Sequence, residues 1–238
     1  MTHKAVPPMP TRDGGEFGYS VMKVALGAIP MAGGAAQELL EKAVGDPLRR
    51  RQEAWTAELG AALNLLIEQV DGITPESLAE DPVFVSAAAR ATQEALMSHG
   101  ERKREALRNT VLNVAAGVRL DEVLSGAFMD YIARFSEGHL KLLALMRNPM
   151  GDAAYAREAS SVYMGSVHGV IVKSHPDLAA QPELLDRLNS DLEKEGLVSG
   201  GLKVMMTGNG VQSSRTTAIG DAFLDFITAP AELQTPTT

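Results

Sequence analysis

Apolar side chains recur at helical spacing in the first long segment that the sequence predicts to be ordered. Over residues 46–70 they lie three or four positions apart and share one helix face, at Trp55, Leu59, Ala62, Leu66 and Val70. Asp46 and Pro47 provide an N-cap and a first-turn proline, and Asp71-Gly72 provides a stop. The pattern therefore predicts a helix over residues 46–70.

Proline and glycine divide the next stretch in the same way. Thr74-Pro75 opens a short helix and Asp81-Pro82 opens a longer one. The longer helix carries a narrow stripe of mostly small side chains, at Phe84, Ala88, Ala91 and Ala95. This stripe favours close contact with another helix, and His99-Gly100 predicts a break after it.

Three more helices are expected by the same criteria, over residues 101–116, 120–135 and 137–147, with Ser136 as the cap of the last. Residues 148–151 read Asn-Pro-Met-Gly, which predicts a linker. Helices joined by short loops indicate a helical bundle up to this point.

The pattern changes after the linker. A helix is expected over residues 153–173, with a turn at His175-Pro176. Gln181-Pro182 then opens a helix with one leucine face, at Leu184, Leu185, Leu188 and Leu192. Gly196 ends this helix as its C′ residue.

Short strands are expected next, at residues 197–198 and 202–207. Gly208-Asn209-Gly210 is expected as a hairpin turn, because glycine tolerates positive φ. A last helix is expected from about Thr217. Helix, short helix, helix, two-stranded wing and helix is the outline of a winged helix-turn-helix.

The sequence thus predicts a mainly α fold, a helical bundle followed by a small winged-helix-like α+β module. The bundle spans residues 17–148 and the module residues 151–228. Residues 1–16, with three prolines and a Gly-Gly pair, are expected to form a disordered leader. Residues 229–238 are expected to form a disordered tail.

The start of the bundle, residues 17–44, is rich in small side chains. Pro30 and Gly33-Gly34 should break it into two short helices. Its longest uncharged stretch has 14 residues, fewer than the roughly 20 that a membrane span needs. Three arginines come shortly after this segment. They could anchor an interfacial helix on anionic lipid, or they could form the solvated first turn of the next helix. The candidate membrane or partner contacts are Leu26, Ile29, Met31, Arg49, Arg50 and Arg51.

Composition narrows the range of functions. Of 238 residues, 45% are hydrophobic and only 5% aromatic, which favours packed helices over sheets. The chain has no cysteine, which excludes disulfides and thiolate zinc sites. No signal-peptide pattern is present, so we expect a cytoplasmic protein, or one peripheral to the inner membrane if residues 17–44 contact lipid.

Charge argues against nucleic acid as the partner. The formal net charge is −8, and the expected reading helix of the winged-helix module, residues 182–195, carries five acids against two basic residues, a net charge of −3. Both values oppose the approach of phosphates. The basic candidates on the wing are Lys203 and Arg215.

The residue types that carry catalysis do not form a known pattern. The five histidines include no pair at i,i+4 spacing and no HExxH motif, and no serine lies in a GxSxG elbow. Gly208-Asn209-Gly210 has neither the third glycine nor the following helix of a nucleotide loop. His139, four residues from Phe135 and from Leu143, is expected as a satisfied histidine of the core or its boundary rather than as a ligand. We therefore expect no enzyme, no cofactor, no metal and no small-molecule substrate.

Three runs carry a resemblance to a known group. They are ATQEALMSHGERKREALRNTVLN at 91–113, GAFMDYIARFSEGHLKLLALM at 126–146, and ELLDRLNSDLEKEGLV with TAIGDAFLDFI at 183–198 and 217–227. Their order resembles bacterial and phage-borne helical proteins that include the abortive-infection alpha type, over residues 50–228. These runs are packing signatures, so the resemblance implies a phage-defence or mobile-element setting without any catalytic residue.

We expect a non-enzymatic α-helical protein whose partner is another protein or a second copy of itself, in bacterial phage defence. A winged-helix DNA-binding regulator is one alternative. A membrane-active effector that uses residues 17–44 is the other.

Overall fold

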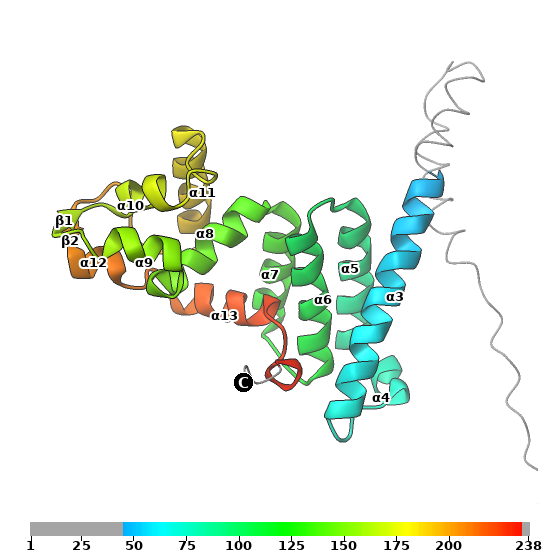
Figure 1. Cartoon of the computed structure of the whole chain (residues 1–238). Coiled ribbons are helices and arrows are strands. Elements are labelled where there is room, and N and C mark those ends of the chain that lie inside the picture. Colours follow the sequence, from blue (N-terminus) through cyan, green and yellow to red (C-terminus); the bar gives the residue numbers. More distant parts are fainter. Residues whose placement is uncertain (1–44, 235–238) are drawn as a thin grey trace, which may run out of the picture. The chain divides into compact units, whose positions relative to one another are not determined.

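The computed structural model describes residues 45–234 (Figure 1). The described residues belong to two units, residues 45–57 and residues 58–234, and α3 (Asp46–Gln69) runs through both. The predictions for residues 1–16 and 17–44, with Leu26, Ile29 and Met31, lie outside the described residues. No helix in the described range is both long enough and apolar enough to cross a membrane.

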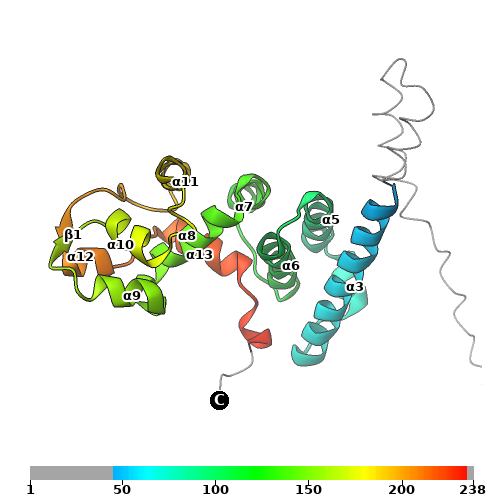
Figure 2. The ribbon, with the colours of Figure 1, turned by 45° about the horizontal axis from the view of Figure 1, so that its top comes forward.

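The mainly α fold is confirmed. The described residues contain eleven α-helices, α3 to α13, and one sheet of two short strands. After α3 come α4 (Pro75–Glu80), α5 (Pro82–Met97), α6 (Glu101–Ala115) and α7 (Glu122–Arg134). Figures 1 and 2 show α5, α6 and α7 side by side.

Local capping sets where these helices begin. Thr74 and Ser77 form a reciprocal capping box at the start of α4. Asp81 accepts a 2.9 Å hydrogen bond from the backbone N–H of Val83 at the start of α5, and Asp121 caps α7 in the same way. The expected helix boundaries in this region hold to within two residues because such signals are local.

The core of the second unit follows the predicted helix faces. Ala91 and Ala95 of α5 are buried, which confirms the close helix contact expected of the small-residue stripe, and α5 packs on α6. Another apolar cluster joins the second half of α3 to the short helix α4 and the end of α6, through Leu66, Leu78 and Leu112.

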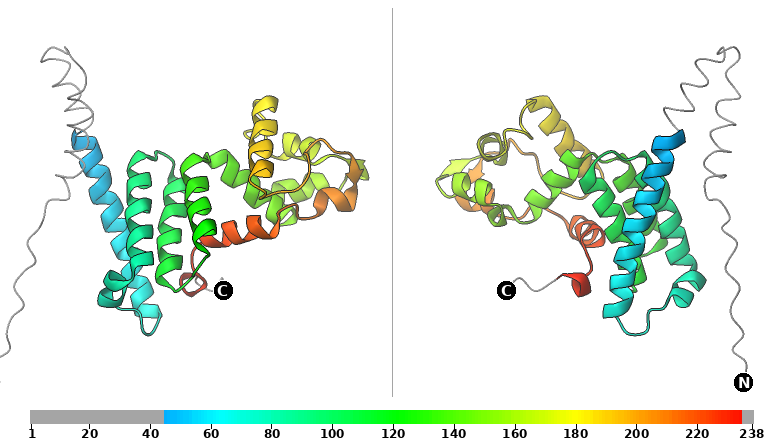
Figure 3. Two further views of the ribbon diagram at one scale, coloured as in Figure 1. Left: turned by 180° about the vertical axis from the view of Figure 1, so that it is seen from behind. Right: turned by 45° about the vertical axis from the view of Figure 1, so that its right-hand side comes forward.

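Two further helices meet the bundle. They are α8 (Glu137–Arg147) and α13 (Ala218–Ile227), and α13 packs on α6 and α8 (Figure 3). Phe223 of α13 meets Phe128 and Tyr131 of α7 edge to face, with ring centroids 5.2 Å and 5.6 Å apart. The domain boundary predicted at residues 148–151 stays a prediction. Helix α13, which follows it in the chain, shares this core with α6, α7 and α8, which precede it.

Smaller elements make up the rest of the second unit. In chain order they are η2 (Pro149–Gly151), α9 (Ala153–Ala159), β1 (Met164–Gly165), α10 (Val167–Ser174), α11 (Pro182–Lys194), β2 (Met206–Thr207), α12 (Gly208–Gln212) and η3 (Ala231–Leu233). The predicted linker is thus a 3-10 turn, whose first residue, Asn148, accepts from the N–H of Gly151 at 3.1 Å. The expected tail begins with the ordered turn η3, and residues 235–238 lie outside the described range.

Two predictions for this part are wrong. The single helix expected over residues 153–173 is two helices, α9 and α10, with β1 between them. The hairpin expected at residues 208–210 is instead the first turn of α12, for which Thr207 is the N-cap. A side chain on Gly208 would collide with the carbonyl oxygen of Val162, so this glycine permits a close backbone approach rather than a turn.

The expected wing strands pair differently as well. β2 pairs antiparallel with β1, placing Met164 opposite Thr207, and Val198 forms an isolated antiparallel bridge with Thr216. Gly196 does end α11, with φ of 68°, and Thr217 does cap α13. The predictions that failed concern segments whose structure depends on contacts with distant parts of the chain.

Candidate functional site

The predicted basic contacts on α3 lie on an exposed helical turn. Arg49, Arg50 and Arg51 are all exposed, and Arg49 Nε lies 4.0 Å from Glu53 Oε1 one turn later. An exposed pair of this kind contributes little to stability. Cations at a helix N-terminus are disfavoured by the helix dipole, and the negative charge of Glu53 offsets this effect.

The two predicted nucleic-acid contacts are both engaged within the chain. Lys203 Nζ lies 2.6 Å from Asp186 Oδ2 on α11. Arg215 donates from Nη2 to the Ser199 carbonyl at 2.7 Å, and its backbone N–H donates to the Met146 carbonyl at 2.9 Å. Arg215 thus ties together three segments, while Lys203 neutralises an acid on the expected reading helix.

Sequence reasoning missed a serine–histidine–aspartate arrangement at the start of α8. His139 Nδ1 lies 2.9 Å from Ser136 Oγ, and His139 Nε2 lies 3.6 Å from Asp191 Oδ2 on α11. The imidazole is buried and stacks on Phe135 at 4.8 Å between ring centroids. Residues of these three types can build a nucleophile, its base and the group that orients the base.

The hydrogen bonds indicate a helix cap instead. The backbone N–H of Ser136 donates to His139 Nδ1 at 3.1 Å, so the single lone pair of that nitrogen is already in use. The 3.6 Å separation from Asp191 exceeds a hydrogen-bond length. Burial also lowers the pKa of His139, against the smaller opposing effect of Asp191, which makes the imidazole a weaker base. His139 therefore takes the place of the glutamate in a capping box.

A second arrangement of the same kind joins α9 to α10. His175 Nδ1 lies 2.9 Å from Ser174 Oγ, and His175 Nε2 lies 3.2 Å from Asp152 Oδ2. The Ser174 hydroxyl donates to the Val170 carbonyl at 2.9 Å, so its proton points away from the imidazole. The hydrogen bond from the backbone N–H of Tyr155 is the main reason that the pKa of Asp152 lies below its usual value, and the nearby His175 lowers this pKa to a smaller extent. This trio clamps two helices together without an activated hydroxyl.

Exposed apolar side chains gather around β1 and β2. Tyr163 is 89% exposed, Met164 61% and Met205 63%, and Val204 is also exposed. Met164 pairs across the ribbon with Thr207, and Met205 lies immediately before β2. We call these four residues the ribbon patch. Large exposed apolar groups of this kind mark interaction surfaces.

A metal site is not among the candidates in the described part of the chain, where no three histidine, aspartate or glutamate side chains gather closely enough to hold an ion. The Ser136-x-x-His139 spacing was the one local signal for the cap at α8. Asp191 lies 52 positions further along, beyond the reach of any local pattern. Comparison of the chain with protein-family models, with curated proteins and with solved structures finds no match.

Proposed function

We propose that this protein acts without catalysis, by binding protein partners through the ribbon patch. The observation that carries the proposal is the exposure of Tyr163, Met164 and Met205 in a chain with few aromatic residues. Methionine adapts its shape to different partners, and tyrosine is enriched among residues that dominate interface energetics. A cytoplasmic location and the phage-defence setting implied by the resemblance belong to the same proposal.

The first partner that we propose is a second copy of the chain. Within residues 45–234 neither β1 nor β2 has a third strand beside it, and a two-stranded ribbon is only marginally stable by itself. Pairing the ribbons of two copies about a two-fold axis would extend the sheet and cover both methionines of each copy. Other proteins with an apolar surface are the alternative partners.

The absence of catalysis is proposed from the hydrogen bonds of the two serine–histidine–aspartate arrangements. In the first, the Nδ1 lone pair of His139 accepts a backbone N–H. In the second, the Ser174 hydroxyl donates to a helix carbonyl. Neither leaves a hydroxyl poised against a free base, which nucleophilic catalysis needs.

A winged-helix-like module remains part of the proposal. In its support, α10 and α11 come before the antiparallel bridge between Val198 and Thr216, and α13 comes after it. The segment between the two bridged residues contains β2 and α12 rather than the expected hairpin. The DNA-binding alternative has less support, because Lys203 and Arg215 are both engaged by groups of the chain itself.

Sedimentation velocity over a concentration series tests the proposal. We expect the wild-type chain to dimerise reversibly, and Met164→Glu and Met205→Glu each to raise the dissociation constant at least tenfold, because each places a charge in an apolar contact. Val123→Glu is the matched control, since Val123 is a 77% exposed apolar residue on α7, outside the ribbon patch. A wild-type chain that stays monomeric contradicts self-association, and equal weakening by Val123→Glu contradicts the ribbon patch as the contact.

A further inference from the structure

A polar cavity lies between the end of α7, the start of α8 and the second half of α11. Its volume is about 390 Å³, and its lining includes Arg134, His139, Arg187, Asp191 and Glu195. A water molecule occupies about 30 Å³ of the liquid, so the cavity has room for a ligand of several non-hydrogen atoms.

Most charges of the lining are already paired. Arg187 Nε lies 2.8 Å from Asp191 Oδ2, and Arg134 Nη2 lies 2.8 Å from Glu195 Oε1. Arg187 is also the main reason that the pKa of Asp191 lies below its usual value, so this carboxylate is ionised at neutral pH. The remaining charged group of the lining is Lys194, whose Nζ lies 3.8 Å from Asp191 Oδ1. Three cations therefore face two carboxylates, and each carboxylate lies beside at least one cation, so the cavity offers both donors and acceptors.

One polar atom of the lining has no partner. Because His139 Nδ1 accepts the N–H of Ser136, the neutral imidazole carries its proton on Nε2. That Nε2–H belongs to a residue only 9% exposed and donates to no group of the chain. The closest carboxylate oxygen, Asp191 Oδ2, is 3.6 Å away. A buried donor thus lies beside a half-buried carboxylate that Arg187 already engages, slightly too far away to donate to it.

We propose that this cavity binds a neutral ligand carrying hydroxyl groups, of the polyol or sugar class. One hydroxyl oxygen accepts from His139 Nε2–H and donates its own proton to Asp191. The Arg134–Glu195 pair offers a second donor and acceptor to a neighbouring hydroxyl. A phosphate or carboxylate fits less well, because its oxygen at His139 would also lie beside the ionised Asp191.

Isothermal titration calorimetry and side-chain ¹⁵N spectra of the full chain test the proposal, with glycerol, D-ribose and D-glucose as neutral probes and inorganic phosphate as the anionic probe. We expect at least one neutral probe to bind and to shift the His139 Nε2 signal. His139→Asn is expected to weaken that binding at least tenfold, because asparagine can accept the Ser136 N–H through Oδ1 but its shorter side chain places no donor at the position of His139 Nε2. Asp191→Asn, which removes the charged acceptor, is expected to weaken it as well.

Asp186→Asn is the matched control, since Asp186 lies on the same helix, pairs with Lys203 and does not line the cavity. Circular dichroism of each variant checks that the fold is kept. If His139→Asn unfolds the chain, the proposal is still tested by the ¹⁵N shift of His139 in the wild type and by the affinity of Asp191→Asn for the neutral probe. Binding of phosphate alone, no shift of His139 with any neutral probe, or equal weakening by Asp186→Asn would overturn the proposal.

Discussion

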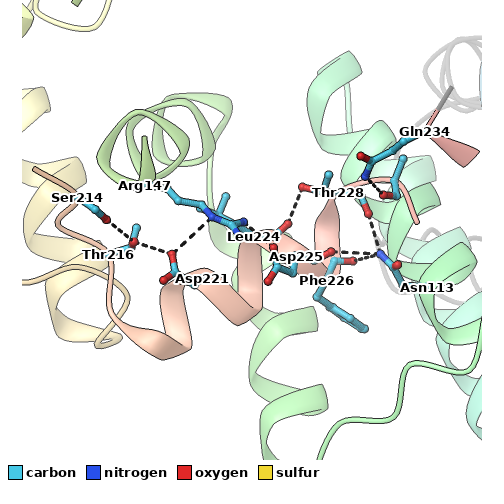
Figure 4. A network of polar contacts seen from close by, with 11 residues as sticks. Asn113, Arg147, Ser214, Thr216, Asp221, Leu224, Asp225, Phe226, Thr228 and Gln234 are labelled. Atoms are coloured by element: carbon cyan, nitrogen blue, oxygen red, sulfur yellow. Dashed lines mark hydrogen bonds and ion pairs between the residues drawn. The ribbon is translucent and has the colours of Figure 1, made fainter. Parts of the chain in front are cut away.

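Asn113, on α6, holds the end of α13 by donating from its side-chain amide to three backbone carbonyls (Figure 4). The distances from Nδ2 are 2.7 Å to the oxygen of Thr228, 2.9 Å to that of Phe226 and 3.3 Å to that of Asp225. An amide has two protons, so these contacts amount to two full hydrogen bonds with the third carbonyl sharing. The last carbonyls of a helix have no partner within the helix, and Asn113 supplies one.

Replacing Asn113 by alanine should therefore lower the free energy of unfolding substantially. Each lost hydrogen bond contributes about 1 kcal/mol, and the buried Phe226 carbonyl, left without this donor, adds a penalty of similar size or larger. We expect a total loss of about 2–4 kcal/mol, larger than most single substitutions cause.

Asn109, one turn earlier on α6, provides the internal comparison. It is also buried, but its amide makes one hydrogen bond, to the Ile227 carbonyl at 3.0 Å, and its Oδ1 has no partner. Asn109→Ala loses that bond while removing an unsatisfied buried acceptor, so its expected cost is only about 0–1 kcal/mol. Both substitutions remove the same side-chain atoms, so the difference between them reflects chiefly the hydrogen bonds.

Urea denaturation followed by circular dichroism measures both variants. We expect Asn113→Ala to be less stable than Asn109→Ala by at least about 1 kcal/mol, with equal slopes against urea. Equal losses, or a larger loss for Asn109→Ala, would refute the argument that Asn113 anchors α13.

The remaining predictions concern the buried His139 and two helical glycines. A titration followed by side-chain NMR should give His139 a pKa below the ordinary 6.5 of histidine. Asp191→Asn should lower this pKa further, because the Asp191 carboxylate favours the charged imidazole. Since the pKa of His139 is lower in the folded than in the unfolded chain, the stability that the neutral imidazole contributes is present above about pH 6.5 and is lost as the pH falls through the folded pKa. A measured pKa above 6.5 would contradict this prediction. Gly220→Ala should destabilise by about 3 kcal/mol or more, because its Cβ would collide with the Leu197 carbonyl. Gly126→Ala, in open space on α7, should instead stabilise by about 0.5–1 kcal/mol, and thermal denaturation distinguishes the two.

The helices were predictable because their signals are local. Thr74 and Asp81 lie immediately before the helices that they cap. Of the leucine face expected on α11, Leu185, Leu188 and Leu192 are buried, whereas Leu184 is exposed. The same reasoning failed where a distant segment decides the structure. β1 exists because Met164 and Gly165 meet β2, about 40 positions later, and this pairing interrupts what would otherwise read as one helix.

The sites were less predictable than the fold. His139 was correctly expected in the core or at its boundary, but it is not fully satisfied, because its Nε2 has no hydrogen-bond partner. Its approach to Asp191 depends on how α8 packs against α11. A side chain on Gly138 would press on Leu188 at 3.2 Å, so this packing is close. The ribbon patch was not foreseen, because the exposure of Met164 and Met205 depends on what covers them and not on their neighbours in the chain.

The charge of α11 shows how pairing alters an argument made from composition. From sequence, residues 182–195 carry five acids and two bases, and this net charge of −3 is the reason to disfavour DNA. In the structure Asp186 pairs with Lys203, and Glu195 pairs with Arg134, so adding these two cations to −3 leaves −1. The acidity of the helix is therefore a weaker obstacle than the sequence suggests.

The stronger obstacle to DNA binding is the use already made of the cations. To reach a phosphate, Lys203 would have to give up a 2.6 Å contact with Asp186 and leave that carboxylate facing the DNA. Arg215 would have to release the Ser199 carbonyl. Each exchange trades an existing contact for a new one and brings an acid or a bare carbonyl towards the phosphates. The case for a protein partner thus rests on which groups are satisfied: Lys203 and Arg215 are, whereas Tyr163, Met164 and Met205 remain largely exposed to solvent.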